Sequence, residues 1–168
     1  MDWNIRPARL NDVEALADVH VAAWNAARPA GFESLPVSDR IDQWRNRLES
    51  EGKRHSTFVA EIGGSLAGFV RVRPTPDDDM DSAVVGRLDE LYVAEAHWGS
   101  GLAHTLMDRG LTFLTESGFS RAVLWVIEEH PRAHAFYAKH SWSPDGARKI
   151  AFSAHGREVM EIRFTKTL

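Results

Sequence analysis

LDELYVAEAHWGSGLAHTLM, residues 88–107, is the stretch that decides the fold of this chain. An apolar segment, Leu88 to Val93, runs into a turn with two glycines, Gly99 and Gly101, and the turn opens directly into a predicted helix. The first N–H groups of a helix have no partner within the helix, and they lie at the positive end of its dipole. The stretch therefore predicts a strand, a turn and a helix whose N-terminus binds an anion.

The strand within this stretch breaks the two-residue period of a β-strand. Two polar residues separate Leu88 from Leu91, whereas one residue separates Leu91 from Val93. An extra residue at Asp89-Glu90 would restore the alternation, so a β-bulge is one explanation. A plain irregularity at a sheet edge is the other, and periodicity alone leaves both open.

The rest of the chain shows the same kinds of signal on either side of this stretch. Periodicity and Gly or Pro turns predict strands at 3–6, 57–62, 65–72, 122–126, 148–153 and 158–165, helices at 13–24, 38–48, 102–118 and 131–140, and turns at Gly63-Gly64 and His155-Gly156. The order predicts one domain, residues 1–168, of mixed α/β class around a largely antiparallel sheet. The strand–helix–strand unit from Leu88 to Val126 should be right-handed and parallel.

Composition excludes several classes of protein. The chain has 168 residues, 43% of them hydrophobic, a net charge of −4 and no cysteine. Without cysteine there is no disulfide, thiolate metal site or Cys nucleophile. No basic block suggests nucleic acid, no apolar run approaches the roughly 20 residues that cross a bilayer, and no secretory signal is evident. We expect a cytoplasmic protein that binds neither nucleic acid nor membrane, and we leave open whether it forms a homodimer.

The glycine turn does not fit the common nucleotide motifs. It has no Gly-Lys-[Ser/Thr], which disfavours an ATP-binding loop, and it lacks the third glycine of the dinucleotide fingerprint.

The turn instead resembles that of the GNAT (GCN5-related) N-acetyltransferases. In that family, amides of an Arg/Gln-x-x-Gly-x-Gly/Ala turn after a bulged strand hold the pyrophosphate of acetyl-CoA. Here the pattern falls on Trp98 to Ala103, and Trp98 replaces the Arg or Gln, which removes one possible side-chain donor.

A second stretch, residues 130–142, resembles the family's Asn, Arg-Ala, Phe-Tyr and Gly-Phe pattern. His130 replaces the Asn and Ser141-Trp142 replaces Gly-Phe, but the spacing from Arg132 to Tyr137 is intact. The two motifs imply the GNAT fold, a mostly antiparallel twisted sheet with a splayed parallel strand pair, flanked by helices.

The resemblance also implies acetyl-CoA as co-substrate, without a metal. The strand edge at Leu91 to Val93 would pair with pantetheine amides, and the turn would bind phosphate. The residues expected to contact acetyl-CoA are Leu91, Tyr92, Val93, Gly99, Ser100, Gly101, Leu102, Ala103, His104, His130, Ala133 and Tyr137.

Two residues are the catalytic candidates. Tyr137 resembles the family's general acid: a phenol, with a pKa of about 10, stays protonated at neutral pH and can protonate a departing thiolate. The alternative is a core tyrosine beside Phe136. Glu90, at the bulge, is the candidate general base for the ammonium of the acceptor, with Asp89, Glu128 and Glu129 as competitors; the alternative is a solvated strand carboxylate.

Three further patterns have simpler interpretations. His130 and His134 have a zinc-like spacing, but no H-E-x-x-H accompanies them. The aspartates at 77–81 lack the glycine and final glutamate of a calcium loop, so we expect a solvated loop. Trp24, Phe32 and Trp44 either line the acceptor site or pack in the core.

The sequence thus predicts an acetyl-CoA-dependent N-acetyltransferase that transfers the acetyl group directly to a primary amine. Direct transfer is expected because there is no Cys and no nucleophile-elbow serine to form an acyl-enzyme. The expected acceptor is a small molecule, with a peptide or protein amine second. A non-catalytic acyl-CoA sensor is the alternative from another class.

Overall fold

The computed structural model describes residues 2–152 and 158–168. Its elements are β1 (Asn4–Pro7), α1 (Val13–Ala27), α2 (Ser38–Glu49), β2 (Ser56–Ile62), β3 (Ser65–Pro74), β4 (Val85–Val93), α3 (Leu102–Glu116), β5 (Arg121–Ile127), α4 (Pro131–Lys139), β6 (Ser143–Phe152) and β7 (Glu158–Thr167), with short 3-10 turns at Leu10–Asp12 and Glu95–His97. The predicted mixed α/β class and element order are confirmed. None of the helices in this part of the chain is long and apolar enough to cross a membrane.

All the strands belong to one sheet, in the order β1-β2-β3-β4-β5-β7-β6. Every neighbouring pair is antiparallel except β4 and β5, which are parallel as predicted. Gly63 and Gly64 both have positive φ, which gives the β2–β3 hairpin the tight turn that its twist favours.

The last hairpin differs from its prediction. β6 begins at Ser143 rather than Arg148, because Ser143 and Pro144 already pair with β7 before an irregularity that ends at Arg148. That irregularity interrupts the alternation on which the prediction rests. Ser153 and the predicted turn at His155-Gly156 lie outside the described residues.

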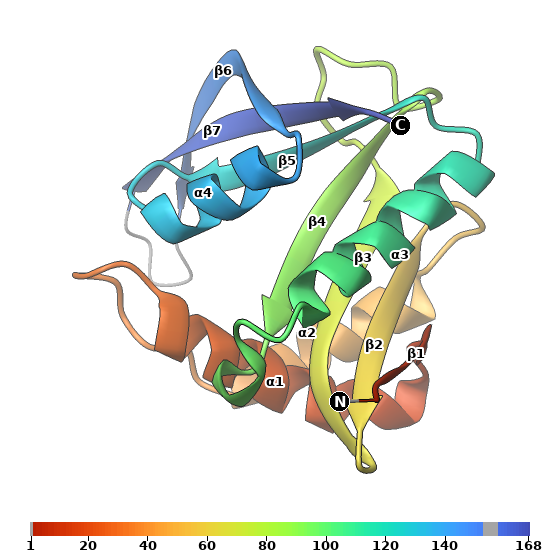
Figure 1. Cartoon of the computed structure of the whole chain (residues 1–168), viewed down its shortest axis with the longest axis vertical. Helices are drawn as coiled ribbons and strands as arrows, with labels where there is room; N and C mark the ends of the chain where they lie inside the picture. Colours follow the sequence, from red (N-terminus) through yellow and green to blue (C-terminus); the bar gives the residue numbers. More distant parts are fainter. Residues whose placement is uncertain (1, 153–157) are drawn as a thin grey trace.

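Helices cover the sheet on both faces (Figure 1). α3 packs on β2, β3 and β4 and buries Leu106, Met107 and Leu114 against the larger core. α4 contributes to the same core beside β5 and β7. α1 and α2 cover the opposite face of β3 and β4, with Leu16 and Trp44 in a second core.

The parallel strands β4 and β5 separate soon after they meet. They pair only where Val85 to Arg87 face Arg121 to Val123. β4 continues to pair with β3 as far as Val93, so beyond Arg87 its other edge has no strand partner in the described chain. The predicted splay is confirmed.

The bulge in β4 is also confirmed. Arg71 of β3 faces Glu90, but the next residue, Val72, faces Leu88, which leaves Asp89 as the extra residue. Leu88, Leu91 and Val93 then pack toward the larger core, while Tyr92 packs against the second core on the other face.

Candidate functional site

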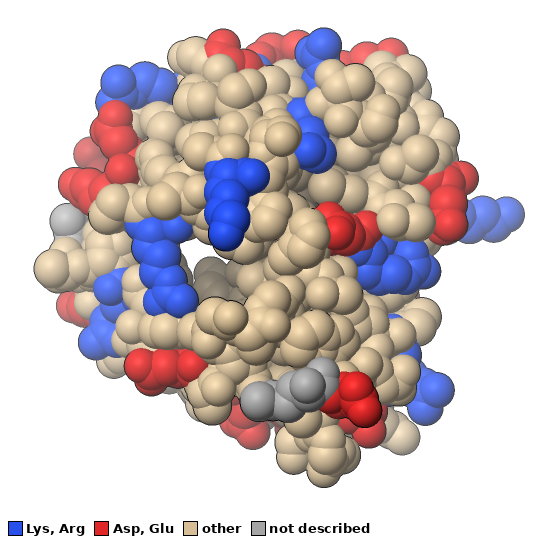
Figure 2. All heavy atoms as spheres, viewed as in Figure 1, with Lys and Arg blue, Asp and Glu red and all other residues tan. Residues whose placement is uncertain are grey.

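Two cavities meet in the gap between β4 and β5. The first, of about 340 Å³, lies on the face of α1 and α2 and extends to β7. The second, of about 170 Å³, lies between β4, α3 and α4. The residues that line both are Ala27, Leu91, Tyr92, His130, Ala133 and Tyr137. Figure 2 shows the surface hollowed between the regions of α4 and α1, with basic side chains beside the opening.

The glycine turn presents backbone donors at the N-terminus of α3. Gly101, at the N-cap, has a φ of 92° and Gly99 has a φ of 75°, a conformation that side chains disfavour. The amides of Gly101, Ala103 and His104 make no hydrogen bond within the described residues. Unpaired amides at the start of a helix are the donors that an anion-binding turn requires.

Two of the turn residues in the predicted set stabilise the turn itself. The Ser100 hydroxyl donates to the His97 carbonyl (2.6 Å) and accepts from the Leu102 amide (3.3 Å). The Leu102 side chain is fully buried in the larger core. The Leu102 amide is therefore less available to a ligand than its neighbours.

Trp98 has a structural role that the sequence comparison did not show. Its indole Nε1 donates to the Val93 carbonyl at 2.8 Å, and the Arg132 guanidinium lies 3.6 Å from the centre of its ring. Trp98 thus connects the turn to β4 and to α4. Its own donor points into the protein.

The free edge of β4 offers backbone groups to the second cavity. The Ala94 amide donates to the carbonyl of Ala67 in β3, and peptide groups along a strand point alternately to either side. The groups of Leu91 and Val93 therefore point into the gap. The Val93 carbonyl already accepts from Trp98, whereas the Val93 N–H and both groups of Leu91 face the gap.

Tyr137 lies where the two cavities join. Its ring packs near Phe136, Trp142 and Phe164, yet it lines both cavities, and its hydroxyl has no hydrogen-bond partner in the described residues. Burial raises its pKa, so the phenol stays protonated at neutral pH. Tyr92 lines the same junction, and burial raises its pKa as well.

Of the four candidate carboxylates, Glu90 best fits a base. It lines the first cavity, and Arg47 of α2 donates to it at 2.8 Å. Burial raises its pKa, while the charge of Arg47 opposes the rise. Glu128 and Glu129 are exposed and line neither cavity. Asp89 is surrounded by three arginines, whose charges outweigh burial and lower its pKa.

Sequence reasoning missed His20, whose side chain also lines the first cavity. It is 4% exposed, accepts from Trp44 Nε1 at 3.3 Å, and its ring lies 4.7 Å from that of Tyr92. Burial lowers its pKa to about 3, so it is neutral at pH 7. The period of α1 placed it on the apolar face, where a histidine carries no signal of its own. Trp44 proves to be core, whereas Trp24 and Phe32 line the cavity.

Comparison with known proteins decides the family. Residues 14–142 match the model of the "Acetyltransferase (GNAT) family". The chain belongs to this family. It is 29% identical over 164 residues to the "Uncharacterized N-acetyltransferase YuaI" of Bacillus subtilis, covering 94% of this chain and 89% of that protein.

Solved GNAT structures share the fold. The yncA acetyltransferase of Salmonella typhimurium, solved "with its cofactor Acetyl-CoA", aligns with a TM-score of 0.73 at 16% identity over 100% of this chain and 95% of that one. The paia N-acetyltransferase of Thermoplasma acidophilum, in complex with coenzyme A, aligns with a TM-score of 0.69 at 18% identity over all of both chains.

Three histidines of this GNAT chain, His104, His130 and His134, have partners of their own. His130 caps α4 by accepting from the Ala133 amide, and His134 Nε2 bonds the Ile127 carbonyl at 2.9 Å. His104, expected at the phosphate turn, is half-exposed, pairs with Asp108 and stacks on His140. Residues 2–152 and 158–168 contain no group of three side chains arranged to hold a metal ion.

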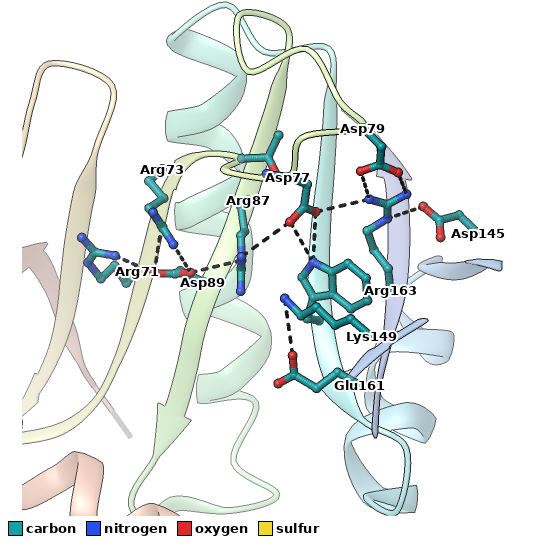
Figure 3. Close-up of polar contacts among 12 residues, drawn as sticks. Arg71, Arg73, Asp77, Asp79, Arg87, Asp89, Asp145, Lys149, Glu161 and Arg163 are labelled. Carbon is teal, nitrogen blue, oxygen red and sulfur yellow. Dashed lines mark hydrogen bonds and ion pairs between the residues drawn. The ribbon is translucent and has the colours of Figure 1, made fainter. Parts of the chain in front are cut away.

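The expectation of a solvated aspartate loop is wrong for Asp77. Its carboxylate is largely buried and accepts from Trp125 Nε1 of β5 at 2.9 Å. It also pairs with Arg163 of β7, which binds Asp79 through two hydrogen bonds of 2.8 Å (Figure 3). The loop is thus anchored to the far half of the sheet.

Asp89→Asn tests how much the buried charges at the bulge contribute to the free energy of unfolding. We expect the free energy of unfolding to fall by about 3 kcal/mol or more, because Arg71, Arg73 and Arg87 would lose their shared anion. Since the folded protein lowers the pKa of Asp89, its contribution is complete at neutral pH and is lost as the pH falls through that lowered value.

Urea unfolding at pH 7 measures the change. Asp42→Asn is the control, because the Asp42 side chain is 83% exposed. If the two variants lose the same small amount, the cluster does not stabilise the sheet.

Proposed function

We propose that this chain is an acetyl-CoA-dependent N-acetyltransferase that transfers the acetyl group directly to a primary amine of a small molecule. The observation that carries the proposal is the junction of the two cavities at Tyr137, through the gap between β4 and β5. A donor on one face and an acceptor on the other can meet there without an acyl-enzyme.

The second cavity and the turn fit the donor. Free amides at the start of α3 suit the pyrophosphate, and the open edge of β4 suits the pantetheine amides. Related folds solved with acetyl-CoA or coenzyme A support the assignment. Acetyl-CoA, when bound, supplies the reactive thioester.

We assign the two proton transfers to two side chains, Glu90 and Tyr137. Glu90 takes the proton of the attacking amine, and its raised pKa makes it a stronger base than an exposed glutamate. As the new C–N bond forms and the C–S bond breaks, Tyr137 donates its proton to the departing thiolate. The free hydroxyl of Tyr137 suits this role.

The size of the first cavity favours a small acceptor. About 340 Å³, walled by side chains of α1, α2, β5 and β7, holds a molecule of modest size.

Ligand-induced stabilisation and thiol release test the function itself. Acetyl-CoA at about 100 times its Kd should raise Tm by about 5–10 °C, while ATP should not. Release of free coenzyme A thiol with a panel of amines then separates an enzyme from an acyl-CoA sensor. If acetyl-CoA does not stabilise the protein, both the enzyme and the acyl-CoA sensor are contradicted.

Tyr137→Phe isolates the general acid. Removal of one hydroxyl should lower kcat by about 100-fold or more and leave KM for acetyl-CoA within about twofold. Tyr92→Phe is the matched variant, because both phenols line the same junction. An unchanged kcat in Tyr137→Phe, or an equal loss in Tyr92→Phe, would contradict the assignment.

The pH profile tests Glu90. A base must be ionised, so kcat/KM should rise as the pH passes upward through the raised pKa of Glu90. Arg47→Gln removes a charge that lowers this pKa, and should move the rise to higher pH. Glu90→Gln should abolish the rise and lower kcat about 100-fold. If Glu90→Gln keeps the wild-type profile while remaining folded, Glu90 is not the base.

A further inference from the structure

Five charged side chains line the first cavity, and they differ in whether their partner in the protein carries the opposite charge. They are Arg40, Arg87, Asp89, Glu90 and Glu161. Glu90 pairs with Arg47, and Glu161 lies 3.5 Å from Lys149. Both carboxylates are therefore neutralised by a cation from the protein itself.

Arg87 and Asp89 belong to a continuous chain of ion pairs across the sheet (Figure 3). Asp89 joins Arg71, Arg73 and Arg87; Arg87 leads to Asp77, and Asp77 to Arg163, which also binds Asp79 and Asp145. Four arginines thus meet four aspartates. This network is balanced and offers no net charge to a ligand.

Arg40 is different. Its Nη1 donates to the neutral side chain of Gln43 at 2.6 Å, and it makes no ion pair with any described carboxylate. Its Nε is buried without a hydrogen-bond partner in the described residues. The same is true of Nε in Arg71, Arg73 and Arg87, but those three arginines share Asp89, whereas Arg40 faces no carboxylate of the described chain. A cation in the wall of a cavity without an anionic partner suits an anion that arrives from outside.

The charge of Arg40 acts inside the cavity. Burial lowers the pKa of His20, and Arg40 lowers it further. Burial raises the pKa of Tyr92, and Arg40 opposes that rise. Arg40 is therefore close to the two aromatic side chains that lie beside the cavity junction.

Arg40 and Arg47 allow a comparison within one helix. They are seven residues apart on α2, so they project from the same face, with about 10 Å between them along the axis. Arg47 has a carboxylate of the protein, Glu90, as its partner. Arg40, on the same face, has none among the described residues.

We propose that the acceptor is an amino acid-like molecule, a primary amine that also carries a carboxylate, and that Arg40 binds this carboxylate. The proposal rests on the proposed function, since Glu90 and Tyr137 mark the end of the cavity that receives the amine. Arg40 is the proposed polar contact for the carboxylate of the same acceptor. Trp24, Phe32 and Leu35 line the same cavity, and their apolar surfaces suit an apolar side chain on the acceptor.

The first measurement compares acceptors that differ only in the carboxylate. Thiol release is measured with α-, β- and γ-amino acids that carry apolar side chains. The carboxamide of each amino acid is assayed in parallel as a second substrate, and the acetylated product is identified by mass. The wild-type kcat/KM should be about 10- to 100-fold higher for the carboxylate than for the amide, because a bidentate charge-assisted pair is lost in the amide.

The second measurement locates the contact. In Arg40→Gln, the ratio of kcat/KM for the amino acid to kcat/KM for its carboxamide should fall to near one. The change should come mainly from a higher KM for the amino acid. Arg40→Lys, which keeps the charge without the planar fork, should restore part of the ratio. Arg45→Gln is the matched control on the same helix, with a side chain that is 51% exposed, and it should keep the wild-type ratio.

The outcomes separate this proposal from the one on which it rests. If the wild type acetylates amines but prefers the amides, or if Arg40→Gln keeps the preference, the carboxylate proposal fails and the acetyltransferase stands. If Arg40→Gln does not fold, Arg40→Lys and the wild-type ratio still decide. If acetyl-CoA neither stabilises the protein nor reacts with any amine, both proposals fail.

Discussion

The separation of β4 from β5 is the constraint on which the rest of the structure depends. A sheet normally satisfies its backbone groups strand by strand, yet these parallel strands pair over only three residues on each. The backbone beyond them must find other partners. The Trp98 indole donates a hydrogen bond to the Val93 carbonyl, and the remaining backbone groups of Leu91 and Val93 face the second cavity. In the proposed reaction, the same opening lets the acetyl donor and the amine approach from opposite faces.

Charged side chains hold the two halves of this divided sheet together. The chain of ion pairs from Arg71 to Asp145 runs across β3, β4, β7 and β6, and Trp125 of β5 joins it through Asp77. It crosses the sheet beside the short contact between β4 and β5, where backbone hydrogen bonds are few (Figure 3). Buried charges are tolerated because each has a partner, so the loss of one carboxylate costs more than its own contacts. Arg40, outside this network, has no such partner in the described chain.

The two sides of the junction differ in how far local sequence could predict them. The proposed donor side depends mainly on a continuous stretch, from the bulge at Asp89 to the turn at Gly99 and Gly101. Its strand and turn follow from periodicity and glycine positions, and periodicity offers the bulge as one of two explanations. Residues 130–137 and two alanines of α1, Ala23 and Ala27, complete the lining of its cavity. The proposed acceptor side combines residues of α1, α2, β5 and β7, which are far apart in the sequence. A lone histidine or arginine in a helix has no pattern that reveals what it will face.

Asp77 and Arg40 illustrate the limit best. In the sequence, Asp77 belongs to a run of acids that is typical of a solvated loop, and Arg40 to a charged helix face. Tertiary packing brings Asp77 to Trp125 and Arg163, 48 and 86 residues away, and turns Arg40 toward a cavity. Element order and the glycine turn depend on neighbours in the chain, so the sequence alone was sufficient for them. It left the bulge as one of two explanations, because a bulge is defined by the register of β4 against β3. The partner of each charge depends on which distant strands adjoin, and that is decided only when the sheet has formed.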